Sequence, residues 1–384
     1  MSKIAVIGIS TLFPGASTPE AFWQNLIENR DSTSEATTVQ MGVDPKSFYS
    51  EEPNTNDKYY CMRGGYIGDV VFEPEQLGVS PEEFERLDDL KKWSLYVAHE
   101  ALKDSGYVDN SDVLKRCGVI LGNLSFPTKS SNQLFVPIYH QVLNQAIIDL
   151  TGDDSFVLPR YSEPRAVTRE AGLIAGYPAG LIGDTLGLGG TRFALDAACA
   201  SSLYSTKLAC DYLRVGAADL MLAGAVSAAD PMFVNMGFSI FQAYPENGIS
   251  APLDRRSQGL FAGEGAGMLV LKRYEDALRD GDTIHATILG GGLSNDGKGQ
   301  FVLSPNTKGQ VTCFERAYAD AGIDRRSVDY IECHATGTPL GDKVELTSME
   351  TFFASDDDAH VPMVGSVKSN LGHLLTAAGM PGMT

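Results

Sequence analysis

The sequence predicts an α/β fold, and three observations lead to this prediction. Eight short runs of aliphatic and β-branched residues have the length of buried strands. Amphipathic helical patterns lie between many of these runs, an alternation typical of α/β proteins. The chain of 384 residues, with 43% hydrophobic and 21% charged residues, is long enough to bury a large core. The predicted strands comprise residues 3–9, 118–121, 192–198, 219–225, 267–272, 284–289, 329–333 and 361–367.

Two of the helices between these strands have clear ends in the sequence. Ser80-Pro81-Glu82-Glu83 is a capping box with proline at the first helical position, and Gly106 is a stop signal, so one helix is predicted between them. A second is predicted from about residue 309 to 321, with Gly322 as its stop. Residues 123–170 are too long for a simple connection and carry aromatic side chains. They are expected to form a folded excursion that lines a cleft or an interface.

Charge and composition argue against several classes of function. The 30 Lys and Arg residues against 49 Asp and Glu residues give a net charge of −19, which disfavours a nucleic acid or an anionic membrane surface as partner. No apolar run is long enough to span a bilayer, so no membrane span is expected. The six cysteines form no C-x-x-C pair and no zinc-type spacing with histidine, so neither a metal site nor disulfides are expected. These features predict a cytoplasmic protein.

Cys199 is the first candidate for a chemical role. It lies in Asp196-Ala197-Ala198-Cys199-Ala200-Ser201-Ser202, between a predicted strand and a predicted helix. At a helix N-terminus, free backbone N–H groups and the helix dipole favour a thiolate over a thiol. The alternative is a small core cysteine without chemistry, which is the commoner role of a free cysteine. The strand-to-helix junction leaves both interpretations open.

Two histidines occupy comparable junctions. His334 leaves a predicted strand and enters a turn that carries the hydroxyls of Thr336 and Thr338, which suits a polar ligand at the floor of a cleft. His373 follows Lys368 in a loop between another predicted strand and a helix of small residues. The alternative for each is a histidine that bonds only the backbone of its own turn. Three junctions of one kind, carrying a cysteine and two histidines, favour a shared site over coincidence.

Three segments together resemble the β-ketoacyl synthases of the thiolase-like superfamily, in their polyketide-synthase form. They are D-A-A-C-A-S-S at 196–202, H-A-T-G-T-P-L-G-D at 334–342 and V-K-S-N-L-G-H-L-L-T-A-A-G at 367–379. The resemblance covers essentially the whole chain, and some stretches are similar to synthases of polyunsaturated-fatty-acid or heterocyst-glycolipid type. It implies a thiolase-like fold, with two pseudo-duplicated βαβ-type halves in a layered α/β/α/β/α arrangement.

The resemblance divides the chain into residues 1–260, which carry Cys199, and residues 261–384, which carry His334 and His373. It implies that Cys199 is a nucleophile that accepts an acyl chain from acyl carrier protein. The two imidazole N–H groups would then stabilise the enolate that forms when a malonyl thioester loses carbon dioxide. Attack of this enolate on the acyl-cysteine would lengthen the chain by two carbons, in a decarboxylative Claisen condensation.

Further roles and partners follow from the same resemblance. Lys368 matches the active-site lysine of the family, and Thr336 and Thr338 match positions that bond the phosphopantetheine arm of acyl carrier protein. No metal and no directly bound cofactor are implied. The strand at 192–198 pairs with its own copy in family dimers, so a homodimer is expected within a multidomain synthase. Candidates for a basic patch that docks the carrier are the Lys and Arg residues at 255, 256, 272 and 273.

The chain ends eleven residues after His373, whereas family members continue through further strands and a Gly-Phe-Gly-type loop. The C-terminal strands are therefore expected to be missing, as in a fragment of a longer synthase. Two alternatives to a catalytic ketosynthase remain. One is a non-catalytic ketosynthase-like partner that affects chain length or dimerises, which the presence of Cys199 disfavours. The other is a thiolase-like enzyme that uses coenzyme A thioesters, which His373 disfavours because thiolases carry a second cysteine there.

Overall fold

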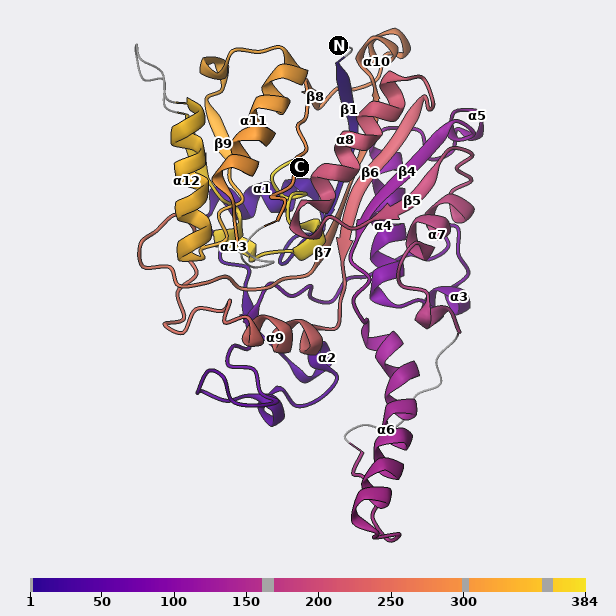
Figure 1. Cartoon of the computed structure of the whole chain (residues 1–384). Helices are drawn as coiled ribbons and strands as arrows, with labels where there is room; N and C mark the ends of the chain where they lie inside the picture. The colour runs from indigo at the N-terminus through magenta and orange to yellow at the C-terminus, as the bar shows by residue number, and fades with distance from the viewer. Residues whose placement is uncertain (1–2, 161–168, 299–303, 354–361) are drawn as a thin grey trace.

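The computed structural model describes residues 3–160, 169–298, 304–353 and 362–384, and Figure 1 shows their arrangement. A large mixed sheet forms the centre of the molecule, with strand order β5-β4-β6-β7-β1-β8. Strands β4, β5 and β6 are parallel, while β7 runs antiparallel to both β6 and β1. The strands are β1 (Ile4–Leu12), β4 (Cys117–Asn123), β5 (Arg192–Leu195), β6 (Leu220–Ser227), β7 (Gly265–Arg273) and β8 (Ala286–Ile288).

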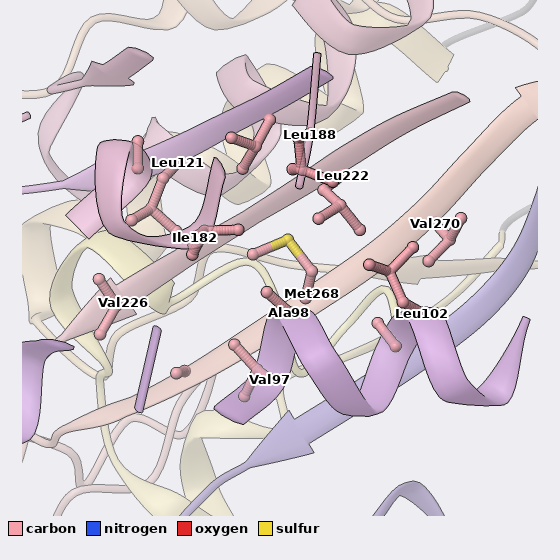
Figure 2. Close-up of a cluster of buried hydrophobic side chains, with 14 of the residues drawn as sticks. Val97, Ala98, Leu102, Leu121, Ile182, Leu188, Leu222, Val226, Met268 and Val270 are labelled. Carbon is pink, nitrogen blue, oxygen red and sulfur yellow. The ribbon is translucent and has the colours of Figure 1, made fainter. Parts of the chain in front are cut away.

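Helices cover both faces of the large sheet. On one face, α4 (Asp89–Asp104) packs against β1 and β7 and also contacts α7 (Tyr177–Thr185). Figure 2 shows Val97 of α4 and Met268 of β7 within this buried cluster. On the other face, α8 (Ser201–Arg214) packs against β4 and β6, both of which are completely buried. Strands buried on both faces explain why these segments are continuous apolar runs and not alternating patterns.

A second, smaller α/β layer lies on the side of the large sheet that α8 covers (Figure 1). It contains the parallel pair β9 (Tyr330–Glu332) and β10 (Met363–Gly365). Two helices, α11 (Thr307–Ala321) and α12 (Pro339–Phe353), pack against each other beside this pair. An ion pair of 3.1 Å between Arg214 of α8 and Asp320 of α11 links the two layers. The layered α/β arrangement that the resemblance implied is therefore present.

All eight predicted strands are present, although their ends differ, and residue 361 lies outside the described residues. The predicted helix at 309–321 is confirmed, with Gly322 in the left-handed conformation that ends it. The single helix expected between Ser80 and Gly106 is wrong, because the structure has two helices, α3 (Pro81–Arg86) and α4. Asp88 causes the break, since its extended backbone and its carboxylate cap the N-terminus of α4.

The excursion predicted at 123–170 contains α6 (Lys129–Thr151), a helix that projects away from the large sheet (Figure 1). Several of its apolar residues are more than half exposed, which is unusual for a helix of 23 residues. No helix in the described parts of the chain is both long enough and apolar enough to cross a membrane. The exposed apolar residues of α6 are Val136, Ile138, Tyr139, Val142, Leu143 and Leu150.

A buried ion pair ties the start of α4 to the start of α6. Lys91 Nζ lies 2.9 Å from Asp88 Oδ2, and only 1% and 4% of the two side chains are exposed. The hydroxyl of Thr128, the N-cap residue of α6, donates to the same carboxylate oxygen at 3.1 Å. Since a buried charge without a partner is strongly destabilising, this pair is required for stability even where its net contribution is small.

We expect Lys91→Met to lower the free energy of unfolding by about 3–5 kcal/mol, because it leaves the Asp88 carboxylate buried without its cation. The double variant Asp88→Asn with Lys91→Met removes both charges and keeps a capping side chain, so it is expected to recover part of that loss. Urea unfolding of the two variants and the unchanged chain measures the difference. A loss below about 1 kcal/mol in Lys91→Met would contradict the argument.

Candidate active site

Cys199 is presented by a strained turn at the N-terminus of α8. The residue before it, Ala198, has φ of +48°, a left-handed conformation that costs free energy in any residue with a Cβ. Two hydrogen bonds hold this turn. The N–H of Ala198 donates to Asp196 Oδ1 at 2.8 Å, and the Ser201 hydroxyl donates to the Ala198 carbonyl at 2.7 Å. The small neighbours of Cys199 leave its side chain only partly buried.

His373 lies just after the short helix α13 (Lys368–Leu371), and its ring is almost completely buried. The backbone N–H of Leu375 donates to Nδ1 of this ring at 3.1 Å, so Nδ1 is an acceptor and Nε2 carries the proton of the neutral imidazole. Leu375 adopts φ of +48° to make this bond. The backbone of His373 is also fixed, because it bonds Phe261 and Gly263 at 2.8 Å on each side.

His334 lies two residues after the end of β9 and stays exposed on one side. Its backbone N–H and that of Ala335 donate to the two carboxylate oxygens of Glu345, each at 2.7 Å. The Glu345 side chain therefore holds the start of this turn with a pair of charge-assisted hydrogen bonds. The rings of His334 and His373 lie edge to face, with centroids 5.6 Å apart.

The structure brings the three predicted junctions together. The sulfur of Cys199 and one ligating atom each of His334 and His373 all lie within 4.8 Å of one another. This separation is larger than a direct hydrogen bond and leaves room for a reacting group between the three side chains. One thiol and two imidazoles are also ligand types that zinc accepts.

Lys368 supplies a buried positive charge beside these groups. It is 7% exposed, and its ammonium donates to the Cys333 carbonyl at 3.4 Å. Burial lowers the pKa of Lys368, while the carboxylates of Glu332 and Glu345 act in the opposite direction. The lysine is therefore positioned where its charge acts on the thiol and both imidazoles.

Desolvation sets the protonation states of the three reactive side chains. Burial raises the pKa of the Cys199 thiol, and the charge of Lys368 offsets only part of that rise. The thiolate expected from the helix N-terminus is thus disfavoured, because loss of hydration outweighs the helix dipole. Burial and Lys368 lower the pKa of His334 to about 4. Burial, His334 and Lys368 lower the pKa of His373 well below its usual range, so both imidazoles are neutral at pH 7.

Thr336 and Thr338 lie in the turn between β9 and α12, where their hydroxyl oxygens are 3.1 Å apart. Thr336 is buried and Thr338 is half-buried. Asp342 closes this turn, because its Oδ1 accepts from the N–H of Gly337 at 3.1 Å. The hydroxyl pair is therefore part of a fixed turn that begins two residues after His334.

Sequence reasoning missed the two residues that position the histidines. Glu345 has a recognisable place in the sequence, because it follows Asp342 at the three-residue spacing of one helix face. Leu375 gave no signal, since nothing about a leucine predicts a left-handed backbone.

Family comparison agrees with this geometry. Residues 1–277 match the family described as Beta-ketoacyl synthase, N-terminal domain, and residues 285–384 match Beta-ketoacyl synthase, C-terminal domain. The chain belongs to the β-ketoacyl synthase family. The two matched regions of this chain are separated by residues 278–284, and a division at residue 260 stays a prediction.

Curated relatives of this chain are components of much larger synthases. One component of the polyunsaturated fatty acid synthase of Thraustochytrium is 34% identical over 391 residues, which cover 100% of this chain and 14% of the relative. Another component of that synthase is 35% identical, covering 99% of this chain and 18% of the relative. A component of the phenolphthiocerol/phthiocerol polyketide synthase of Mycobacterium tuberculosis is 33% identical, covering 99% and 23%. The chain thus spans less than a quarter of each relative.

Solved structures support the same fold. A protein described as PfaC Keto synthase-Chain length factor is 62% identical with a TM-score of 0.94, covering 100% of this chain and 41% of that one. The ketosynthase from module 6 of the bacillaene synthase of Bacillus subtilis is 30% identical with a TM-score of 0.78, covering 99% and 60%. These likenesses establish the thiolase-like ketosynthase fold of this chain.

Two of the four Lys and Arg residues suggested as a basic docking patch form ion pairs inside the protein. Lys272 is 5% exposed and pairs with Asp280 at 2.7 Å and Asp282 at 2.6 Å. Arg273 is engaged in the same way by the carboxylates of two further aspartates. These two residues are structural cations and are not available to a partner. The aspartates that bind Arg273 are Asp219 and Asp276.

We expect Lys368→Met to raise the pKa of the Cys199 thiol further, because the variant removes the main charge that lowers it. The rate of Cys199 alkylation by iodoacetamide at pH 8 should fall about three- to tenfold, since only the thiolate reacts. Peptide mass spectrometry across a pH series measures this rate. Lys103→Met, which removes an exposed charge on α4, is the matched control and should leave the profile unchanged. An unchanged profile in Lys368→Met would contradict the proposed influence of Lys368.

Proposed function

We propose that this chain is a catalytic ketosynthase, which condenses a cysteine-bound acyl chain with a malonyl thioester and lengthens the chain by two carbons. The observation that carries the proposal is the group of three atoms within 4.8 Å, the Cys199 sulfur and one nitrogen each of His334 and His373. A nucleophile next to two neutral N–H donors suits acyl transfer followed by stabilisation of an enolate.

In the first half-reaction, the Cys199 sulfur attacks the carbonyl carbon of an incoming acyl thioester. The tetrahedral intermediate expels the thiolate of the carrier arm, which takes up the proton lost by the Cys199 thiol. The raised pKa of this thiol means that the proton must leave during the attack, and the positive charge of Lys368 favours the developing thiolate. The product is an acyl-cysteine thioester and a free carrier thiol.

In the second half-reaction, a malonyl thioester binds in the same space and loses carbon dioxide. The electron pair of the broken C–C bond moves into an enolate, whose oxygen accepts hydrogen bonds from the two imidazoles. The Leu375 bond fixes His373 with its proton on Nε2, so this ring is already a donor. The enolate carbon attacks the acyl-cysteine carbonyl and expels the Cys199 thiolate, which leaves a 3-oxoacyl thioester on the carrier.

The low pKa values of the histidines serve this chemistry. A protonated imidazolium would protonate the enolate carbon and end the reaction as simple decarboxylation. A neutral imidazole donates a hydrogen bond without delivering its proton. The pKa of about 4 for His334 keeps this ring neutral throughout the physiological range.

Ketosynthases receive their substrates on the phosphopantetheine arm of acyl carrier protein and bind no cofactor directly. We assign the paired hydroxyls of Thr336 and Thr338 to the amides of this arm. Their turn begins two residues after His334, and a pair of hydroxyls can both donate to and accept from an amide. The carrier itself is the proposed partner.

A dimer is the proposed assembly of this ketosynthase. β5 is an edge strand of the large sheet and pairs only with β4 among the described residues. An unpaired edge next to the Cys199 turn can continue the sheet into a second copy of the chain. The exposed apolar residues of α6 support a further contact with a partner chain, because such a surface is costly in water.

The neighbour described as a ketosynthase and chain length factor suggests a second candidate function, a non-catalytic partner that affects chain length. The presence of Cys199 and both histidines favours catalysis over this role. A thiolase-like enzyme that uses coenzyme A thioesters directly is the third candidate.

Cys199→Ala tests the first half-reaction. We expect the unchanged chain to gain the mass of one acyl group from an acyl carrier thioester, and we expect Cys199→Ala to gain none because it lacks the nucleophile. Intact mass spectrometry measures the adduct, with Cys313→Ala as a matched cysteine control. No adduct from carrier or coenzyme A donors would favour the non-catalytic partner, and an adduct from coenzyme A alone would favour the thiolase-like enzyme.

Single substitutions of the two histidines test the second half-reaction. His334→Ala and His373→Ala should retain acylation of Cys199 but lose decarboxylation of malonyl carrier protein by about 10²–10³-fold each, because each removes one donor to the enolate. Release of labelled carbon dioxide and intact mass spectrometry measure the two steps separately. Loss of acylation in both variants would instead assign one histidine as the base that activates the thiol.

A further inference from the structure

Glu332 joins the end of β9 to the start of α13, the short helix that carries Lys368. Oε1 of Glu332 accepts from the N–H of Val367 at 2.8 Å, and Oε2 accepts from the hydroxyl of Tyr330 at 2.7 Å. Val367 is the N-cap residue of α13. The Glu332 carboxylate therefore holds the backbone directly before the lysine.

A second contact runs in the opposite direction between the same two segments. The Lys368 ammonium donates to the carbonyl of Cys333, the residue after Glu332, at 3.4 Å. The parallel pairing of β9 with β10 sets the spacing of the segments, because Glu332 lies opposite Gly365 and the Cys333 N–H donates to the Gly365 carbonyl at 2.8 Å. The carboxylate thus contacts the residue before Lys368, and the ammonium contacts the residue after Glu332.

Both side chains are shielded from water. Lys368 is 7% exposed, and Glu332 is half-buried. A Cβ at Gly382 would lie only 2.6 Å from Cγ of Glu332, so the last turn of the described chain packs closely on this side chain. In such surroundings the attraction between a carboxylate and an ammonium is screened less than it is between exposed charges.

Among the groups around Lys368, Glu332 does most to keep it charged. Burial lowers the pKa of Lys368, and the Glu332 carboxylate opposes this shift more than any other group does. Glu345 acts in the same direction, but both of its oxygens bind the turn of His334, and burial raises its own pKa. The other titratable groups that interact with the lysine are Cys199, Cys333, His334 and His373.

We propose that Glu332 is the positioning residue of Lys368, because its carboxylate holds the backbone that carries this lysine and stabilises the positive charge of the ammonium. This inference rests on the proposed function, in which that charge favours the developing thiolate of Cys199. The charged side chains that act on the Cys199 thiol are Lys368 and Asp196. Glu332 is therefore expected to act on the thiol through the lysine.

Glu332→Gln separates the charge of this side chain from its contacts. The amide oxygen can still accept from the N–H of Val367, and the amide N–H₂ can donate to the hydroxyl oxygen of Tyr330. The variant therefore keeps both connections and removes only the negative charge.

A double-mutant cycle measures how far Glu332 acts through Lys368. The rate of Cys199 alkylation by iodoacetamide is followed by peptide mass spectrometry across a pH series. The four chains compared are the unchanged chain, Glu332→Gln, Lys368→Met and the double variant. Glu350→Gln, which removes an exposed charge on α12, is the matched control.

We expect Glu332→Gln to slow alkylation about threefold at pH 8, because a smaller fraction of Lys368 then carries its charge. The difference should widen as the pH rises above 7, since the variant loses the lysine proton at a lower pH. In the Lys368→Met chain, Glu332→Gln should have no effect. An equal loss with and without Lys368 would indicate a merely structural role and overturn the proposal, as would a profile like that of the control.

Acyl transfer from a carrier-bound donor, measured in the same chains, separates this inference from the proposed function. If the cycle shows the expected dependence on Lys368 but the unchanged chain accepts no acyl group, the catalytic ketosynthase is refuted and the role of Glu332 stands. If the unchanged chain accepts an acyl group and Glu332→Gln behaves like its control, only the role of Glu332 is refuted.

Discussion

Removal of water from the space around Cys199 governs the chemistry of this site. Loss of hydration penalises every charged form, so it raises the pKa of an acid and lowers the pKa of a base. The thiol of Cys199, the imidazole of His373 and the ammonium of Lys368 all shift in the direction that favours neutrality. Neutral imidazoles can donate hydrogen bonds to a developing oxyanion without protonating carbon, which is the property that the proposed condensation needs. In such a medium the remaining attraction between Lys368 and a transient thiolate is also strong.

Two residues with strained backbone conformations hold Cys199 and His373 in position. Ala198 and Leu375 flank the site from opposite parts of the chain, and both have φ of +48°. A left-handed conformation costs about 1–3 kcal/mol in a residue that is not glycine. Each strained residue has an identifiable role, since one aims the Cys199 turn and the other fixes the tautomer of His373 through its N–H. The large buried sheet below supplies the stability that holds both conformations in place.

The sequence predicted the strands and helices more accurately than the protonation states of the site residues. Long apolar runs located eight of the ten strands, most clearly β4 and β6, because a strand buried on both faces has no polar positions. The two-residue strands β2 (Ser34–Glu35) and β3 (Arg63–Gly64) were missed, because they are polar and too short to give a pattern. The convergence of Cys199, His334 and His373 was predictable, since each follows an element whose end the sequence marks. The helix break at Asp88 was missed, because an apolar face continues across it while a single carboxylate caps a new helix. The pKa of Cys199 was also predicted in the wrong direction, because burial depends on atoms from many distant segments.

The four candidate docking cations, at 255, 256, 272 and 273, show most clearly what the sequence alone does not predict. Four Lys and Arg residues look alike in the sequence, yet tertiary structure divides them by what lies around each. Strand β7 carries Lys272 and Arg273 into the reach of aspartates from neighbouring elements, so their charge is neutralised inside the protein. Arg255 stays exposed on a loop that Asp342 holds through the N–H of Leu253. The net charge of an acidic chain therefore does not tell which of its cations stay exposed, because that depends on the carboxylates that the fold brings near each one.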